Sequence, residues 1–219
     1  MRRDRGPSLE ATTRATEHAL VYRIAAMLLE YPDEALRAQM PALQQAVATL
    51  GQPYRQQLEK LLQHLGSSPL PELAADYVAT FDLRRRCCLY LTYYAYGDTR
   101  KRGQALLTFK QAYRAGGVEL TGDELPDHLC VLLEFAATAD LENGRRLLLD
   151  HRAGLELLRL ALGDCGSIYV EALNAVSSTL PVLAGTDREA VARLAAEGPP
   201  GEDVGLEPFA PPDYMGARP

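Results

Sequence analysis

Apolar side chains recur at intervals of three and four residues along most of the chain, and this spacing restricts the fold more than any other feature. The first segment to show it carries apolar residues that would share one face of a helix. These residues are Leu20, Val21, Ile24, Met27, Leu28 and Tyr31. No alternation of apolar and polar residues runs far enough to predict a strand. The spacing therefore predicts an all-α fold, organised as a single-domain multi-helix globule.

Prolines indicate where several helices begin and end. Pro32 closes the first helix, and Pro41 is expected to interrupt the helical pattern over residues 33–50. A further helix is predicted over residues 71–81, because its apolar residues share one face.

The helical spacing continues in the second half of the chain. Residues 83–94 place most of their apolar side chains on one face, which predicts a helix that ends at Gly97. Pro126 is predicted to begin the next helix, and residues 147–162 follow as another stretch with helical spacing.

Composition divides the chain into three parts. Residues 13–197 carry the helical pattern and are predicted to form the folded domain, preceded by a flexible N-terminus over residues 1–12. Residues 198–219 contain ten prolines and glycines. Because such a segment has few apolar groups with which to offset the entropy of ordering, we expect a flexible tail.

Charge and apolar content exclude several classes of partner. The net charge of −6 and the pI of about 5.3 disfavour a nucleic-acid partner, since the molecule as a whole repels a phosphate backbone. Arg23 interrupts the apolar part of the first helix, and no apolar run approaches the ~20 residues that span a bilayer. We therefore expect a cytoplasmic protein with no stable membrane association.

Residues able to carry out catalysis or bind metal are scattered. The four histidines form no H-E-x-x-H motif, and the four cysteines include no C-x-x-C pair. Cys87 and Cys88 are adjacent, and we interpret them as small apolar residues. No nucleophile, base and orienting group can be assembled from the sequence, so we expect no enzymatic activity, no cofactor and no metal.

Two short basic runs lie close together in the sequence. Residues 84–86 are three arginines, and residues 100–102 are Arg, Lys and Arg. Three interpretations of these runs stay open. They form solvated helix faces, they pair with the chain's own surplus acids, or they bind anionic groups of a partner or cofactor. Between them, Tyr93 and Tyr96 lie off the inward face, where they would line a groove or a second packing interface.

The segment Glu124–Leu125–Pro126–Asp127–His128 combines acids and a histidine at a predicted helix start. Free backbone N–H groups at such a position favour an acceptor, and histidine can act as donor or acceptor. In one interpretation Asp127 supports its own helix. In the other, the loop receives a peptide backbone, with Asp127 accepting from amides or from an arginine.

Three long motifs together resemble a known family. They are "LLEYPDEALRAQMP", "YVATFDLRRRCCLYLTYYAYGDTRKRGQALLTFKQAYRAGGVEL" and "ELPDHLCVLLEFAA". They resemble the NarJ-type chaperones, or delta subunits, that assemble respiratory nitrate reductase, within the wider family of TorD-type and DmsD-type chaperones. The similarity covers roughly residues 18–183. Cys88 replaces an expected serine, and Tyr96 replaces an expected histidine.

The resemblance implies a non-enzymatic assembly factor of helical fold. Such a chaperone binds the N-terminal leader of the catalytic (alpha) subunit, supports insertion of the molybdenum cofactor and delays membrane attachment. The leaders of such catalytic subunits are basic and amphipathic, and an acidic protein with an apolar groove is suited to bind them. Proteins of molybdenum cofactor biosynthesis are implied as further partners.

The resemblance also implies positions for the contacts. Leader binding falls on the loop Glu124, Leu125, Pro126, Asp127 and His128. From their place off the inward face, Tyr93 and Tyr96 are expected to contribute to the same groove. From their charge, Asp82, Arg84, Arg86, Arg100 and Arg102 are expected to contact the partner or a cofactor.

Two other functions remain open from the residues. In the first, the chain itself carries molybdopterin guanine dinucleotide, with Arg84, Arg86, Arg100 and Arg102 binding its pyrophosphate. In the second, it is a helical DNA-binding regulator, which the acidic pI disfavours.

Overall fold

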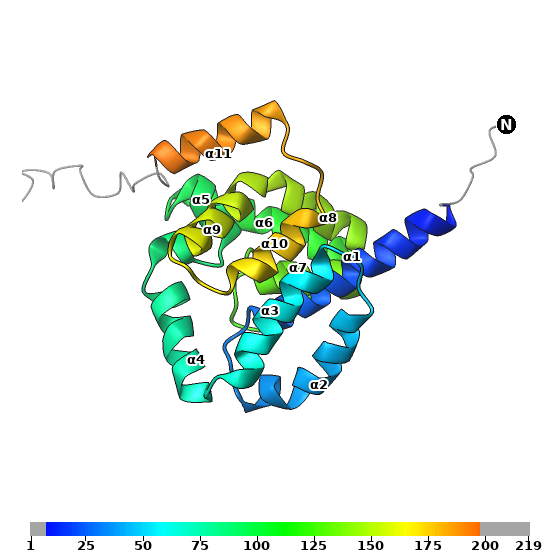
Figure 1. The fold of residues 1–219 in the computed structure, drawn as a ribbon. Coiled ribbons are helices and arrows are strands. Elements are labelled where there is room, and N and C mark those ends of the chain that lie inside the picture. The colour runs from blue at the N-terminus through cyan, green and yellow to red at the C-terminus, as the bar shows by residue number, and fades with distance from the viewer. Residues whose placement is uncertain (1–7, 198–219) are drawn as a thin grey trace, which may run out of the picture.

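The computed structural model describes residues 8–197, and over these residues the chain is helical (Figure 1). In chain order the elements are α1 (Leu9–Leu28), α2 (Glu34–Ala48), α3 (Tyr54–Ser67), α4 (Leu70–Tyr77), the π-helical turn η1 (Val78–Asp82), the 3-10 turn η2 (Arg85–Cys87), α5 (Leu91–Tyr96), α6 (Arg100–Ala115), α7 (Leu129–Thr138), α8 (Leu141–Asp150), α9 (Arg152–Asp164), α10 (Val170–Ser178) and α11 (Gly185–Glu197). No strand forms within this range, which confirms the predicted all-α fold.

The second half of α1 is buried among the other helices, whereas its first half projects from them (Figure 1). Helix α1 packs against α7 and α10, and also contacts α2 and α3 (Figure 1). The core around it consists of fully buried apolar side chains, because the helices turn their apolar faces toward one another. Among these side chains are Val21, Tyr22, Leu28, Leu58, Leu132, Leu133 and Leu173.

The start of α1 differs from the predicted start of the folded domain. Ser8 accepts a hydrogen bond from the Ala11 backbone N–H at 3.2 Å, and this cap lets α1 begin at Leu9. Residues 9–12 are therefore helical, whereas they were predicted to belong to a flexible terminus. The predictions for residues 1–7 and 198–219 lie outside the described residues.

Pro41 does not divide α2, although it lies inside the helix. A proline there removes one backbone hydrogen bond. Helix α2 nevertheless stays continuous because its buried face packs on the core, and tertiary packing supplies most of a helix's stability in a protein. That face comprises Leu36, Met40, Leu43 and Val47.

The helix predicted over residues 83–94 is wrong for its first half. The chain leaves helical geometry after η1, passes through η2, and becomes helical again only at Leu91. Leu83, which was expected to point inward, is 74% exposed. Gly97, with a φ of 54°, does end α5 as predicted, because glycine adopts this backbone conformation without a steric penalty.

Two later helix boundaries also differ from the predicted ones. Helix α7 begins at Leu129, three residues after Pro126, with His128 as its N-cap residue. The helical spacing over residues 147–162 spans two helices, α8 and α9, which are separated at His151. A periodic apolar face continues across such a break because both helices bury their leucines in the same core.

Candidate functional site

The loop that carries "ELPDH" is held by backbone hydrogen bonds to the segment before α5. The Leu91 N–H donates to the Asp127 carbonyl at 3.1 Å, and the Leu129 N–H donates to the Leu89 carbonyl at 2.8 Å. Between these bonds, Tyr90 and His128 form an isolated antiparallel bridge. We call this pairing of residues 89–91 with residues 127–129 the clasp. It explains why residues 88–90 are extended rather than helical, since their backbone groups bond across to another segment.

Asp127 is the buried centre of the clasp. Its side chain is fully buried, and Oδ2 accepts from the Thr92 backbone N–H at 3.1 Å and from the Thr92 hydroxyl. Thr92 lies in the first turn of α5, so Asp127 caps α5 from a distance of 35 residues along the chain. It does not support its own helix start. A ligand could reach this carboxylate only if the clasp opened.

Arg102, near the start of α6, connects the basic run over residues 100–102 to the clasp. Its Nη2 lies 3.8 Å from Asp127 Oδ2, and its Nε donates to the Thr92 hydroxyl at 3.2 Å. Its Nη1 also forms an ion pair with Asp98 at 3.0 Å. The guanidinium lies over the Tyr90 ring, 5.5 Å from the ring centroid. Arg102 is thus engaged inside the protein, which leaves little of it to bind a cofactor pyrophosphate.

Glu124 and His128 extend the same network to the surface. The Tyr90 hydroxyl donates to Glu124 Oε1 at 2.9 Å, and the Leu125 backbone N–H donates to the same oxygen at 2.8 Å. The Tyr90 and His128 rings meet edge to face at 5.2 Å. Burial lowers the pKa of His128 despite the nearby acids, so its ring is neutral near pH 7.

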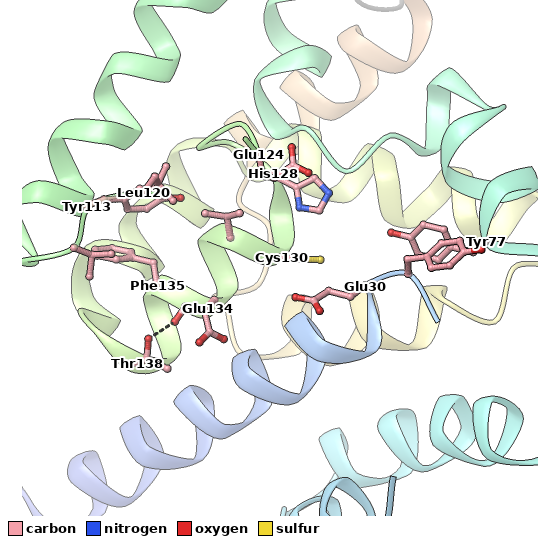
Figure 2. Close-up of a pocket in the computed structure, with 13 residues that line it drawn as sticks. Glu30, Tyr77, Tyr113, Leu120, Glu124, His128, Cys130, Glu134, Phe135 and Thr138 are labelled. Atoms are coloured by element: carbon pink, nitrogen blue, oxygen red, sulfur yellow. Dashed lines mark hydrogen bonds between the residues drawn. The ribbon is translucent and has the colours of Figure 1, made fainter. Parts of the chain in front are cut away.

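A cavity of about 540 Å³ opens beside this network (Figure 2). We call it the α7 groove; its lining residues are Glu30, Tyr31, Tyr77, Tyr113, Val118, Leu120, Glu124, His128, Cys130, Val131, Glu134, Phe135 and Thr138. Its walls come from the end of α1, the ends of α4 and α6, the loop before the clasp, and α7. The groove therefore lies between segments that are far apart in the sequence.

The α7 groove combines an apolar lining with acidic edges. Figure 2 shows Glu124 and His128 on one side of the cavity and Glu30 and Glu134 on the other. Burial raises the pKa of Glu30, an effect that the nearby Arg23 partly offsets. Arg23 also forms an ion pair with Glu134. The groove can thus bury apolar side chains while its edges attract positive charge.

A second hollow of about 320 Å³ adjoins the α7 groove. The two share Tyr113, Val118, Leu120 and Glu124, and the lining of the second hollow also includes Leu125 and Pro126. The Tyr113 hydroxyl donates to the Pro126 carbonyl at 2.6 Å and fixes the end of the loop over residues 118–125 to α6. That loop thus lines both hollows.

The structure separates the predicted leader-binding residues into four groups. Glu124 and His128 line the α7 groove, and Leu125 and Pro126 line the second hollow. Asp127 lies behind them in the clasp. Tyr93 and Tyr96 are half-buried on α5 and line neither cavity.

The residues predicted to contact the partner or a cofactor are also dispersed. The side chains of Asp82, Arg84, Arg86 and Arg100 are exposed. Arg84 lines a different hollow of about 350 Å³, beside the start of α10. Arg102, in contrast, is only 16% exposed because it belongs to the network around Asp127.

Several groove residues were not predicted. Glu30, Tyr31 and Val131 line the α7 groove, although sequence reasoning did not place them in a site. Val131 is the one residue of these that the sequence could have indicated, since it is apolar but lies off the buried face of α7 formed by Leu129, Leu132, Leu133 and Ala136. Glu30 and Tyr31 join the groove only through the way α1 packs on α7.

Comparison with solved structures identifies the class of fold. A structure described as a redox enzyme maturation protein from Archaeoglobus fulgidus superposes with a TM-score of 0.54 at 20% sequence identity. The match covers 81% of this chain and 96% of that one. The chain therefore shares its fold with that protein.

Sequence comparison then gives the family. The nitrate reductase delta subunit family matches residues 30–175. A Bacillus subtilis (strain 168) protein named as a nitrate reductase molybdenum cofactor assembly chaperone, NarJ, is 36% identical over 168 residues, which cover 75% of this chain and 90% of that protein. This chain belongs to the nitrate reductase delta subunit family.

Other relatives show the same similarity over parts of longer proteins. The nitrate reductase-like protein NarX of Mycobacterium tuberculosis (strain ATCC 25618 / H37Rv) is 39% identical over 160 residues, or 73% of this chain, yet the chain spans only 24% of its length. The assembly chaperone NarJ of Escherichia coli (strain K12) is 33% identical over 117 residues, which cover 52% of this chain and 50% of that protein. Within residues 8–197, none of the helices has the length and apolar character needed to cross a membrane.

Proposed function

We propose that this chain is an assembly chaperone for a respiratory nitrate reductase, and that it binds the N-terminal segment of the catalytic subunit in the α7 groove. Its bound client would receive the molybdenum cofactor before membrane attachment, which places the chaperone in the cytoplasm. Two relatives named as assembly chaperones for this enzyme support the general role.

The observation that carries the proposal is the α7 groove itself. A half-open cavity of about 540 Å³ has room for several side chains of a peptide. Tyr31, Leu120 and Val131 line the groove and remain accessible, so they offer apolar surface to the nonpolar face of an amphipathic segment, and burial of that face would drive binding.

Charge supports the choice of a basic segment. Glu30, Glu124 and Glu134 stand around the groove, and the whole chain carries a net charge of −6. Both features attract a positively charged peptide, raising the rate of encounter and the preference for basic sequences.

Calorimetry with a synthetic peptide of the client's N-terminal segment tests the proposal. We expect binding to the wild type at micromolar concentrations and a loss of about tenfold or more for Val131→Lys, which places a positive charge in the groove. Leu107→Lys is the matched control, because Leu107 is exposed on α6 and lines neither hollow of the 118–125 loop. A folded wild type that binds no peptide, or equal losses in both variants, would contradict the proposal.

A further inference from the structure

Glu124 differs from the other two glutamates of the α7 groove in its immediate surroundings. Arg23 pairs with Glu134 and also acts on Glu30, so both charges are partly compensated from within the protein. Glu124 takes part in none of the ion pairs formed among residues 8–197. Its Oε1 accepts instead from the neutral Tyr90 hydroxyl and from the Leu125 N–H. These bonds orient the carboxylate without cancelling its charge.

Tyr90 is itself held by Arg102, which lies outside the groove, and by His128, which lines it. The guanidinium of Arg102 lies 5.5 Å from the centroid of its ring, and the His128 ring meets it edge to face. Burial and the neighbouring Glu124 raise the pKa of Tyr90 to about 12, so its hydroxyl remains a donor at any physiological pH. Tyr90 therefore presents a fixed donor to Glu124.

Arg102 is fixed in turn by three partners. Asp98, Asp127 and the Thr92 hydroxyl each contact its guanidinium, at 3.0, 3.8 and 3.2 Å. A continuous set of contacts thus runs from Asp127 through Arg102 and Tyr90 to Glu124. Neither Tyr90 nor Arg102 lines the α7 groove or the second hollow.

We propose that Glu124 selects a basic side chain of the bound segment, and that Tyr90 and Arg102 are positioning residues that hold its carboxylate in place for that contact. This inference rests on the proposed function, because it assigns the charge preference of the same groove. Orientation before binding matters, since a carboxylate that is already ordered loses less side-chain entropy when the ligand arrives.

The test compares two synthetic peptides with each protein variant. One peptide has the client's N-terminal sequence, and the other has glutamine in place of every lysine and arginine. Tyr90→Phe keeps the ring and removes the hydroxyl, and we expect it to weaken binding of the basic peptide about threefold to tenfold, the effect of one lost hydrogen bond. The same variant should bind the glutamine peptide as the wild type does.

Tyr54→Phe is the matched control. Its hydroxyl contacts His18 on another part of the molecule, so this change should alter binding of neither peptide. Equal affinity of Tyr90→Phe and wild type for the basic peptide, or an equal loss for both peptides, would overturn the inference. A wild type that binds neither peptide would instead overturn the proposed function.

Arg102 is tested by non-additivity. If it acts through Tyr90, the double variant Y90F/R102Q should bind the basic peptide about as weakly as R102Q alone. If the affinity losses of the two single variants simply add in the double variant, Arg102 does not act through Tyr90. Because R102Q leaves the buried Asp127 without its cation, Arg102→Lys is measured in parallel. This variant keeps a positive charge beside Asp127 but loses the planar group over Tyr90. It should therefore also weaken binding of the basic peptide and leave binding of the glutamine peptide unchanged.

Discussion

Asp127 is a buried carboxylate whose partners come from two other segments of the chain. It caps α5 through Thr92 and lies beside the guanidinium of Arg102. A buried charge is tolerated only where such partners are present, because an uncompensated charge in the interior is strongly unfavourable. Asp127 therefore contributes mainly to the fold, and its effect on the α7 groove is indirect.

Asp127→Asn should lower the free energy of unfolding by about 1–3 kcal/mol, because hydrogen bonds to a charged group lose strength when the charge is removed. Chemical denaturation measures this change. Asp123→Asn is the matched control in the same loop, since Asp123 is exposed and should change stability by less than about 0.5 kcal/mol. An equally small effect at Asp127 would show that the clasp does not depend on this charge.

Part of the candidate site could be recognised residue by residue. Glu124 and His128 belong to a short run of acid, proline and histidine that is unusual enough to be noticed in the sequence. The cap from Asp127 to Thr92 could not be predicted, because it joins positions 35 residues apart. Glu30 and Val131 likewise become neighbours of the groove only after α1 has packed on α7.

Helices α7 and α8 pack unusually closely at Gly144. A Cβ atom added to this glycine would lie 2.3 Å from the Cβ of Ala136 and 2.6 Å from its Cα. Such distances leave no room for even one methyl group, and backbone atoms cannot move aside as a flexible side chain would. The close contact matters for function because α7 forms one wall of the α7 groove.

Gly144→Ala should therefore destabilise the protein by about 1–3 kcal/mol, the usual effect of overpacking. Gly103→Ala, in the exposed part of α6, has nothing within 4 Å of the added atom. That change should stabilise by about 0.5–1 kcal/mol, because alanine favours the helix over glycine. Thermal or chemical unfolding distinguishes the two, and a stabilising Gly144→Ala would show that α7 and α8 can separate without loss.

Apolar spacing predicted most of the helices but not all of their ends. It succeeded where one face of a helix meets the core, as in α1. It failed over residues 83–90, where the chain turns through η2 and then enters the clasp at Leu89. The clasp pairs residues 89–91 with residues 127–129, and this long-range pairing overrides local propensity. The same pairing moved the start of α7 from Pro126 to Leu129.

His18 is buried in the folded molecule, and His128 and His151 are half-buried. Burial lowers the pKa of His18, His128 and His151. For His18 the cation of Arg145, whose Nη1 lies 3.1 Å from Nδ1, acts in the same direction, whereas Glu17 opposes it. In the unfolded chain each ring would titrate near its ordinary value of about 6.5.

The unfolding free energy should consequently fall as the pH drops from about 7.5 to about 5.5, because the unfolded chain then binds more protons than the folded one. His18→Gln should reduce this dependence. Urea denaturation at the two pH values measures it. Equal stability at both values would show that these histidines do not remain neutral in the folded protein.

The central claim concerns the whole molecule: a basic N-terminal segment of a client binds in the α7 groove and not on the exposed arginines. Hydrogen exchange with and without the synthetic peptide locates binding directly, because amides that become buried or ordered exchange more slowly. We predict slower exchange over residues 118–138 and unchanged exchange over residues 84–86 and 100–102. Protection of the two arginine-containing segments, with residues 118–138 unaffected, would contradict the account.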